Sequence, residues 1–354
     1  MKQSSSRQGR RRIFLWVLVG CLVLGVGYTA RGILRADAEA GQIQGPEQGV
    51  PAINAGPEQV QAIQSGPHLV YLRQEQSPYG QVNLTGLDPD STQSAQTALR
   101  CDRIYYAADN GLCLMYDQTA AEQDPLAPPR VQVTLFGADF QPRHQSIVEG
   151  IPSRTRVSPD GKYAVFTVFV TGHSYMDADL STATVLLDTA TGESLGNLEE
   201  FETWKDGGLF EAPEFNFWGV TFAKDSNQFY ATLRNGNTTY LLQGDIAARK
   251  MTILHENVEC PSLSPDGTRI AFKKLMGNRW QLTVLDLATL EETELAEKEG
   301  IDDQVEWLDN DHILYQKADY DPPKWVSVFV IPADGSGEPE IFLENATSPV
   351  VVRK

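Results

Sequence analysis

The chain has 354 residues, 41% of them hydrophobic, and a formal net charge of −18. Its length suits one large all-β domain or two domains of ordinary size. Residues 1–35 hold seven Lys and Arg and no Asp or Glu, so the remainder carries 22 basic against 47 acidic side chains. An acidic body of this kind argues against nucleic-acid binding, which needs clustered Lys and Arg, and favours neutral or cationic partners.

The N-terminus joins a basic segment, residues 1–12, to an unbroken apolar run from Ile13 to Ala30. The run approaches the length of about 20 residues that spans a bilayer. Basic flanks stay in the cytoplasm, so the segment after the run should be exported. We therefore expect a transmembrane signal-anchor at 13–30, in a single-pass cell-membrane protein with an extracytoplasmic C-terminal body.

Two alternatives for this segment remain open. Small residues at 36–40 (Ala36-Asp37-Ala38-Glu39-Ala40) would allow cleavage of a signal peptide and secretion. Cys21 would allow lipid anchoring, because Leu18-Val19-Gly20-Cys21 resembles a bacterial lipobox. Each alternative places the body outside the cytoplasm. Residues 36–66 are rich in Ala, Gly, Gln and Pro, so a flexible stalk is expected over 31–66.

From His68 onward the pattern is that of β-strands, with short Val, Ile, Tyr and Phe runs between turn residues. One stretch recurs along this region. Ser158-Pro159-Asp160-Gly161, followed by an apolar run, returns at 264–267, and weaker copies lie at 222–230 and 307–315. Pro presets φ, Asp bonds the backbone ahead, and Gly closes the turn in the left-handed region. A hairpin that repeats every 40–50 residues is typical of a β-propeller, with one blade per repeat.

The strand-like runs group into six blades, and the C-terminus indicates how the ring closes. Leu254-His255-Glu256-Asn257, before the inner strand of the fifth blade, resembles Leu343-Glu344-Asn345 near the C-terminus. By this analogy, residues 350–353 form the inner strand of the first blade, whose other strands come from 68–98. Closure by the two ends leaves no end blade with an open edge. We predict an all-β, six-bladed propeller over residues 67–354, preceded by the transmembrane or signal helix.

The cysteines outside the apolar run are Cys101, Cys113 and Cys260. In an oxidising compartment a pair of them should form a disulfide. Cys101 and Cys113 are nearest in sequence and are the predicted pair, although a tight turn at Asn110-Gly111 would set Cys113 opposite Ala108 instead. Cys260 is expected to be a buried free thiol.

The Ser-Pro-Asp-Gly turns at 158–161 and 264–267, each followed by an apolar strand, resemble the WD-like repeat of TolB-like propellers. The resemblance covers about residues 66–354 and is nearest to exported TolB-like propellers of bacteria. It implies the fold, but propellers host many unrelated activities. The α/β domain that precedes the propeller in TolB proteins does not fit into 36–66, and a hydrolase domain of the peptidase relatives has no room in the chain.

Loop geometry nominates one face of the ring for binding. Loops between second and third strands should share a face with the links between blades, and the Ser-Pro-Asp-Gly turns should lie on the opposite face. The richest mixtures of aromatic and acidic residues fall in these loops and links, and they suit a protein or peptide partner. The candidate binding residues are His173, Tyr175, Asp177, Asp179, Trp204, Trp218, Tyr320 and Trp325.

Several of these residues also have structural explanations that involve no binding or catalysis. Phe217 and Trp218 suit packing between blades, and Trp280 and Trp307 fall in strand patterns. Asp160 and Asp266 are turn formers rather than catalytic acids. His173 with Asp177 and Asp179 has metal-ligand chemistry, but such donors are common in solvated loops, and neither a metal nor a cofactor is predicted.

Three functions remain compatible with the sequence. The preferred one is a non-enzymatic, membrane-tethered module that binds a protein or peptide of the cell envelope. The alternative is a hydrolase or lyase that acts on peptide or glycan at the loop face, although short nucleophile and zinc motifs are missing from the sequence. The third is an envelope-sensing domain whose membrane helix transmits binding.

Overall fold

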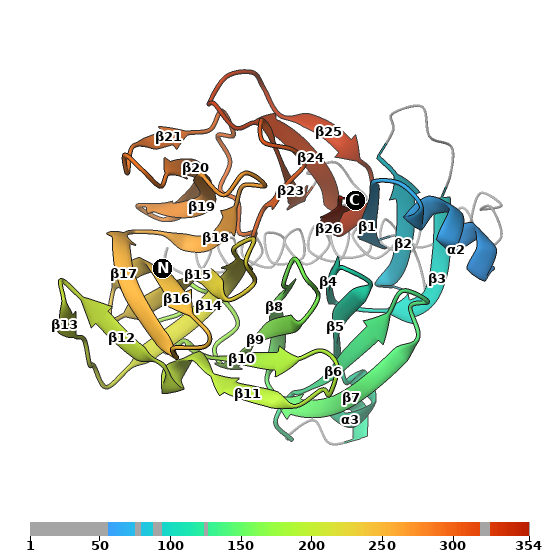
Figure 1. The fold of residues 1–354 in the computed structure, drawn as a ribbon, viewed down its shortest axis with the longest axis horizontal. Coiled ribbons are helices and arrows are strands. Elements are labelled where there is room, and N and C mark those ends of the chain that lie inside the picture. The colour runs from blue at the N-terminus through green and yellow to red at the C-terminus, as the bar shows by residue number, and fades with distance from the viewer. Residues whose placement is uncertain (1–55, 75–78, 88–93, 124–126, 319–325, 354) are drawn as a thin grey trace, which may run out of the picture. The chain divides into compact units, whose positions relative to one another are not determined.

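The fold was analysed in a computed structural model, which describes residues 56–74, 79–87, 94–123, 127–318 and 326–353. Six sheets, each built on four antiparallel strands, stand around a common axis in this part of the chain (Figure 1). We number them as blades 1 to 6 in the order in which the chain builds them. The predicted six-bladed propeller is therefore confirmed.

Each blade has four strands in its basic plan, written here from the axis outward. Blade 1 contains β26 (Ala346–Val352), β1 (His68–Arg73), β2 (Gln81–Gly86) and β3 (Ser94–Arg100). Blade 2 contains β4 (Arg103–Ala107), β5 (Asn110–Tyr116), β6 (Arg130–Gly137) and β7 (Pro142–Glu149), with helix α3 (Gln118–Gln123) between β5 and β6. Blade 3 contains β8 (Ile151–Val157), β9 (Tyr163–Thr171), β10 (Ser181–Asp188) and β11 (Ser194–Asn197).

The second half of the ring repeats the plan. Blade 4 contains β14 (Phe215–Phe222), β15 (Gln228–Asn235), β16 (Thr238–Asp245) and β17 (Lys250–Glu256). Blade 5 contains β18 (Glu259–Leu263), β19 (Arg269–Met276), β20 (Arg279–Asp286) and β21 (Glu292–Glu294). Blade 6 contains β22 (Glu306–Trp307), β23 (His312–Ala318), β24 (Val326–Pro332) and β25 (Glu340–Leu343).

The two ends of the propeller meet in blade 1, as the sequence predicts. Strand β26 pairs antiparallel with β1, with Val350 opposite Val70 and Val352 opposite His68. The closing strand begins at Ala346, four residues earlier than predicted, and a register irregularity lies between Val70 and Leu72. The closed ring leaves no innermost strand unpaired.

The Ser-Pro-Asp-Gly turns have the expected chemistry. Gly161 donates its N–H to the Ser158 carbonyl (2.8 Å) and has a φ of +73°, which favours glycine. Asp160 accepts hydrogen bonds from the Ser158 hydroxyl (2.7 Å) and the Lys162 N–H (3.0 Å). Asp266 makes the equivalent bonds in blade 5. Both aspartates are turn formers, as predicted.

The disulfide between Cys101 and Cys113 is present, with a Cα–Cα distance of 5.5 Å. The objection from Asn110-Gly111 fails because the turn of this hairpin lies two residues earlier, at Ala108-Asp109. Ala108 and Asp109 hold positive φ values of 45° and 59°, and Cys113 pairs with Ile104 in β4. Cys260 is a buried free thiol, also as predicted.

Blade 4 carries an extension that the sequence pattern did not reveal. The link from blade 3 contains a short 3-10 turn, η1 (Leu198–Glu200), and two strands, β12 (Glu202–Lys205) and β13 (Gly208–Leu209). Strand β12 pairs in parallel with β17, and β13 folds back on β12. Blade 4 therefore has six strands, and part of the predicted link lies at its outer edge.

Helix α2 (Pro57–Gln64) corrects the expectation of a flexible stalk over 31–66 for its own eight residues. Pro57 opens the helix, and Val60 and Ile63, three residues apart, are buried in an apolar cluster with Leu84 of blade 1 and Tyr106 of blade 2. The predicted segments 1–12 and 13–30 lie outside the described residues. Within the described part of the chain, no helix has the length and apolar character needed to cross a membrane.

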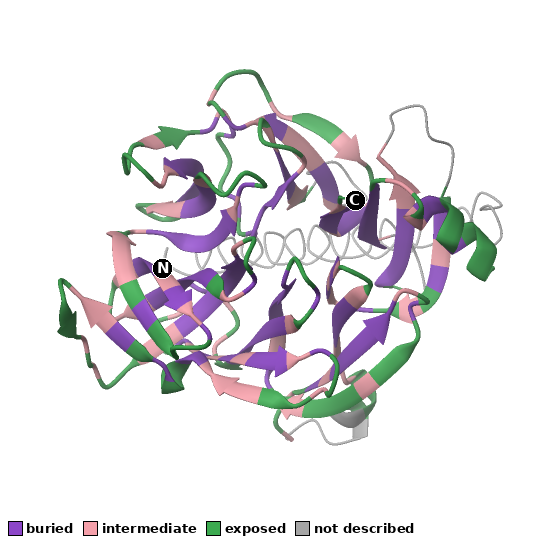
Figure 2. Cartoon of the chain, viewed as in Figure 1, coloured by how far each residue is buried: buried purple, intermediate pink, exposed green. Residues whose placement is uncertain are grey.

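Burial follows the radius of the ring. Inner and middle strands are largely buried, whereas outer strands such as β7 and β25 are mostly exposed (Figure 2). Apolar clusters form between neighbouring blades, as in the cluster that joins Leu112 of blade 2 to Phe166 of blade 3. The inner strands surround the axis, so their side chains line the centre of the ring.

Candidate binding sites on the propeller axis

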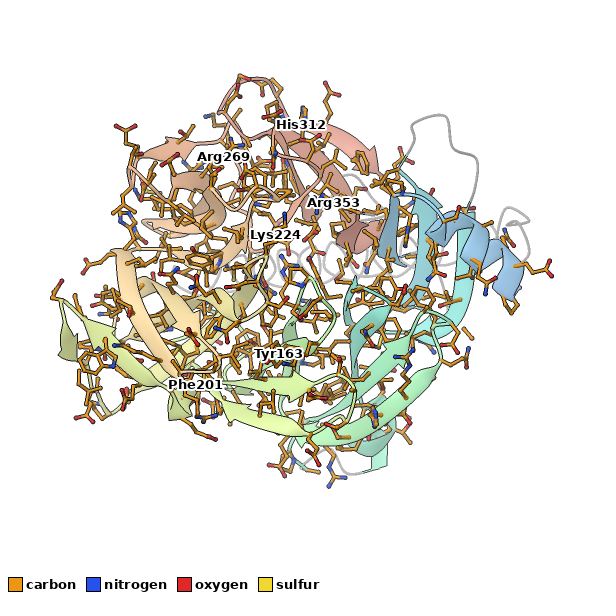
Figure 3. The ribbon with its side chains drawn as sticks, in the orientation of Figure 1. Tyr163, Phe201, Lys224, Arg269, His312 and Arg353 are labelled. Atoms are coloured by element: carbon orange, nitrogen blue, oxygen red, sulfur yellow. A yellow bond between two sulfur atoms is a disulfide. The ribbon has the colours of Figure 1, made fainter. Side chains whose placement is uncertain are left out.

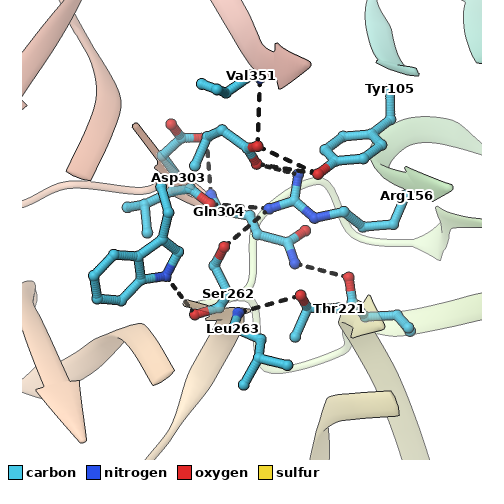
Figure 4. A network of polar contacts seen from close by, with 12 residues as sticks. Tyr105, Arg156, Thr221, Ser262, Leu263, Asp303, Gln304 and Val351 are labelled. Carbon is cyan, nitrogen blue, oxygen red and sulfur yellow. Dashed lines mark hydrogen bonds and ion pairs between the residues drawn. The ribbon is translucent and has the colours of Figure 1, made fainter. Parts of the chain in front are cut away.

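A polar network crosses the axis where the six inner strands approach one another (Figure 4). Its centre is an ion pair between Arg156 of β8 and Glu306 of β22, with 3.3 Å between Nη1 and Oε2. Blades 3 and 6 stand opposite each other in a six-membered ring. Both side chains are buried, so the pair bridges the axis. We call the group formed by Arg156, Gln304 and Glu306, with the residues they bind, the axial plug.

Glu306 ties the plug to two further positions around the ring. The Tyr105 hydroxyl of blade 2 lies 3.3 Å from both of its oxygens. The Val351 N–H of the closing strand donates to Oε1 at 3.4 Å. Burial raises the pKa of the Glu306 carboxyl, while the positive charges of Arg156 and Arg353 oppose that shift. The carboxylate is therefore held by neighbours from blades 1, 2 and 3.

The remaining blades join through Arg156 and Gln304. Arg156 donates to the Ser262 hydroxyl of blade 5 (3.3 Å) and to the Val305 carbonyl (2.9 Å). Gln304 donates to the Val220 carbonyl of blade 4 (3.0 Å) and the Pro261 carbonyl of blade 5 (2.8 Å). All six blades are thus connected across the axis, which fixes the inner strands relative to one another.

On one side of the plug lies a pocket of about 290 Å³. Its rim includes Pro159 and Pro265 of the Ser-Pro-Asp-Gly turns, so we call this side the turn face. Apolar side chains line the walls, and the charged residues of the lining are Arg156, Lys224, Arg353 and Glu306. Since Arg156 and Glu306 neutralise each other, the pocket keeps an excess of two positive charges.

Lys224 and Arg353 supply that excess at the mouth. Both residues are exposed, and neither has a carboxylate partner within ion-pair distance in the described structure. Arg353 donates to the Trp307 carbonyl, and the nearby Glu306, on which its charge acts, is already paired with Arg156. Figure 3 places both labelled side chains near the middle of the ring. The cations therefore stand at the opening of the axial pocket, where an anionic group from solution has access to them.

The opposite side of the plug, the linker face, is filled by aromatic and charged side chains. Tyr175, from the loop between β9 and β10, stacks on Trp218 of blade 4 with 4.6 Å between ring centroids. Its hydroxyl bonds the Ser153 hydroxyl of blade 3. The fully buried Lys273 of blade 5 has its Nζ 4.8 Å from the Tyr175 ring and 3.9 Å from the Trp280 ring. The loop thus closes this end of the axis with a tyrosine.

Ion pairs surround the tyrosine. One oxygen of Asp302, Oδ1, receives both Lys273 (2.5 Å) and Arg154 (3.3 Å). Burial would raise the pKa of Asp302, but these two cations hold it below its ordinary value. Burial raises the pKa of Glu259, against the opposing charge of Lys273. Burial also raises the pKa of the Cys260 thiol, which suits its behaviour as an inert core residue.

The predicted binding residues fall into different environments. Tyr175 and Trp218 come together, but both are buried in the core under the linker face. His173 is exposed, and Asp177 uses a carboxylate oxygen to accept the N–H groups of His173 and Ser174. Asp179 is exposed on the same loop. Trp204 lies on β12 at the outer edge of blade 4, under Lys250. Tyr320 and Trp325 lie outside the described residues.

The turn-face pocket and the axial plug were missed from sequence. Arg156 and Glu306 are 150 positions apart, and neither belongs to a local motif. One signal was available in Ser153-Arg154-Thr155-Arg156-Val157, where two arginines alternate within a strand that leads into a Ser-Pro-Asp-Gly turn. Residues at i and i+2 point to the same side of a strand, so this pattern indicates a polar face toward the axis. No group of three or more His, Cys, Asp and Glu in the described residues has metal-site geometry.

This arrangement is a six-bladed β-propeller whose fold is similar to that of TolB. No protein-family model matches the chain, and no curated protein matches it in sequence. Among solved structures, TolB from Acinetobacter baumannii matches with a TM-score of 0.55 and 13% identity, over 81% of this chain and 67% of that chain. A nidogen/laminin complex matches with a TM-score of 0.52 and 11% identity, over 81% and 98%. A putative TolB from Agrobacterium tumefaciens has a TM-score of 0.46 and 12% identity, over 78% and 88%. At these identities the likeness is one of fold.

Proposed function

We propose that this chain is a membrane-tethered, extracytoplasmic propeller that acts as a non-enzymatic binding module for a protein or peptide. The observation that carries the proposal is the turn-face pocket, a concave site on the axis with two uncompensated cations at its mouth. The chain as a whole is acidic, with a net charge of −18, yet at this point it presents two cations without an ion-pair partner in the described structure. The site therefore attracts an acidic group while the rest of the surface does not.

The walls of the pocket suit a polypeptide segment. Pro159, Leu263 and Val352 are among the lining residues that are exposed or half-buried, and they offer apolar contact area. A volume of about 290 Å³ is at the lower end of small-ligand pockets, which matches one or two side chains rather than a large cofactor. A segment that combines a carboxylate with an apolar side chain would meet both the cations and the walls.

The axial plug supports a receptor rather than a channel. Arg156, Gln304 and Glu306 lock the floor of the pocket to all six blades. A site whose floor is already ordered loses little conformational entropy when it binds. One neighbour in fold comes from a nidogen/laminin complex, a protein–protein assembly. This supports a protein partner here, and we place that partner in the cell envelope.

Export and tethering rest on two features of the chain. The apolar run Ile13–Ala30 with its basic flank is long enough for a membrane anchor. The disulfide between Cys101 and Cys113 suits an oxidising compartment. Labelling of single cysteines with a membrane-impermeant maleimide in intact cells tests this part. A cysteine at Ile147, on exposed β7, should react without lysis, and reaction only after lysis would refute export.

Site-specific photo-crosslinking in the native host tests the binding function. A photoreactive amino acid at Ala108, an exposed residue of the pocket lining, should give discrete higher-mass adducts. The matched control is the same amino acid at Ile147, which is 55% exposed on the outer edge of blade 2. Adducts at 108 that disappear in Lys224→Glu would support the pocket. Equal crosslinking at both positions, or none at 108, would refute it.

One observation favours the enzymatic alternative, a hydrolase or lyase for peptide or glycan at the linker face. Glu259 and Asp302 both lie near Lys273, and their pKa values are shifted in opposite directions, upward and downward. Pairs of carboxyls with such a split supply an acid and a base in many enzymes. Turnover of peptide or glycan substrates that Glu259→Gln abolishes, while thermal stability is kept, would establish this activity.

A further inference from the structure

A second, much smaller cavity lies on the axis behind the plug. Its volume is about 30 Å³, and residues from blades 1, 2, 3 and 6 line it. Three of these residues are arginines: Arg103 of β4, and Arg154 and Arg156 of β8. The proposed peptide site lies on the other side of Arg156, so this cavity is a distinct feature.

The wall of the cavity contains three guanidinium groups and one carboxyl group. Asp303 is its one acidic residue, and both oxygens of Asp303 accept backbone N–H groups, from Gln304 (2.8 Å) and Gln316 (3.0 Å). The carboxylates that pair with Arg154 and Arg156 belong to Asp302 and Glu306, which are not part of the wall. Of the three guanidinium groups in the lining, only that of Arg103 therefore lacks an ion pair with a carboxylate in the described structure.

Two of the arginines have unused binding capacity. Arg154 is 91% buried, and its Nε–H has no hydrogen-bond partner. Arg103 donates only to backbone carbonyls, those of Ser153 (2.8 Å) and Asp102 (2.8 Å), and has no carboxylate within ion-pair distance in the described residues. Burial and the neighbouring charge of Arg154 lower the pKa of Arg103. A guanidinium group that is shielded from water and has an unpaired donor or no carboxylate partner is stabilised by a counterion.

The size of the cavity limits the occupant. One water-sized group needs about 10–15 Å³ of such volume, so 30 Å³ accepts a single halide or one to two waters. A metal cation would be repelled by the guanidinium groups. The amide groups of Gln304 and Gln316 also belong to the lining and complete a polar wall.

We infer that this cavity is a binding site for one small monovalent anion of the chloride class, held among Arg103, Arg154 and Arg156. The anion satisfies the free donor of Arg154 and lies beside the guanidinium of Arg103, which donates only to backbone carbonyls. It links blade 2 to blade 3 from inside the ring. The bound anion stabilises the folded propeller, and this effect does not depend on what the turn-face pocket binds.

Crystallography with bromide tests the assignment directly. Crystals of the wild-type protein grown with sodium bromide should show an anomalous peak in the cavity, at contact distance from the Arg154 Nε. Ordered water in the same place, with no anomalous signal, would overturn the proposal. This readout uses the native protein and does not depend on any variant folding.

Thermal unfolding in solution separates a specific site from an ion present only at crystal concentrations. At constant ionic strength, replacing gluconate by chloride should raise the unfolding midpoint saturably, by about 2 °C or more. Arg103→Met should lose this chloride dependence, whereas Lys298→Met, which removes an exposed cation far from the lining, should keep it. A wild-type unfolding midpoint that is the same in chloride and in gluconate would refute the site.

Discussion

The two ends of the propeller axis are built from the same inner strands but finish differently. At the turn face, Lys224 and Arg353 stand exposed over an open pocket, and their charges have no carboxylate partner among the described residues. At the linker face, Lys273 and Arg154 are buried, share Asp302, and are covered by the ring of Tyr175. The turn face keeps its cations available to a ligand, whereas the linker face pairs its cations within the fold.

This contrast shows how a ring of similar blades acquires a single binding end. Charges that are buried need partners, because an unpaired buried ion is costly. Exposed charges contribute little to folding and are free for recognition. Substitutions should therefore differ sharply in their effect on stability, from a large loss at the buried charges to almost none at the exposed ones.

The largest loss of stability is expected at the plug that separates the two ends. Glu306→Ala leaves Arg156 buried without its partner, so we expect the free energy of unfolding to fall by about 3–5 kcal/mol. Chemical denaturation measures it. The double variant Arg156→Met/Glu306→Leu should lose less than the single one, since no charge is left unpaired. A single variant as stable as the wild type would contradict the bridging role.

Removal of the tyrosine at the linker face should come next. Tyr175→Ala deletes a ring that packs on Trp218 and Phe169 and lies beside two cations, and we expect a loss of about 3 kcal/mol. Tyr175→Phe keeps the stacking and loses only the bond to Ser153, so it should cost about 1 kcal/mol. Equal losses in the two variants would show that the hydroxyl, not the ring, closes this end.

A pH dependence should mark the linker face. Lys273 and Arg154 lower the pKa of Asp302 in the folded protein, so its stabilisation is fully present above the ordinary carboxyl pKa of 3.8 and disappears as the pH falls through its lower folded value. Because 43% of the side chain is exposed, we expect only about 1 kcal/mol at pH 7. Unfolding of wild type and Asp302→Asn, followed from pH 7 to pH 2, should converge at the acid end. A constant difference across this range would exclude the ionised carboxylate as the cause.

The smallest effect on stability is expected at the turn face. Lys224→Gln and Arg353→Gln should each change the free energy of unfolding by less than about 0.5 kcal/mol, as is usual for exposed side chains. Both should reduce crosslinking from Ala108 at the same time. A large loss of stability in either variant would place these cations in the fold rather than in the binding site.

The fold was predictable because its determinants are local. Each Ser-Pro-Asp-Gly turn carries its own hydrogen bonds, and the strand after it has its own apolar pattern. Ring closure was also readable, because the segment before β26 resembles the segment before β18. The parallel strand β12 was not, since it joins blade 4 through backbone pairing with β17 and needs no distinctive side chains.

The candidate site was less predictable because it is assembled from distant positions. Aromatic residues guided the nomination of Tyr175 and Trp218, but a propeller needs large aromatic side chains between its blades, and the structure places both there. The pocket uses a lysine after β14 and an arginine at the C-terminus, residues that no local pattern distinguishes from solvated surface. Only the ring brings them together.

Blade 1, which contains both ends of the ring, also determines how the propeller would respond to mechanical load. Any tension on the segment before α2 reaches the body first at Val60 and Ile63 and then at His68, where β1 starts opposite the last residues of β26. Strand β1 pairs with β26 on one side and with β2 on the other, so both ladders share the load once it passes His68. Helix α2 therefore stands where it would absorb force before the seam of the ring begins to open.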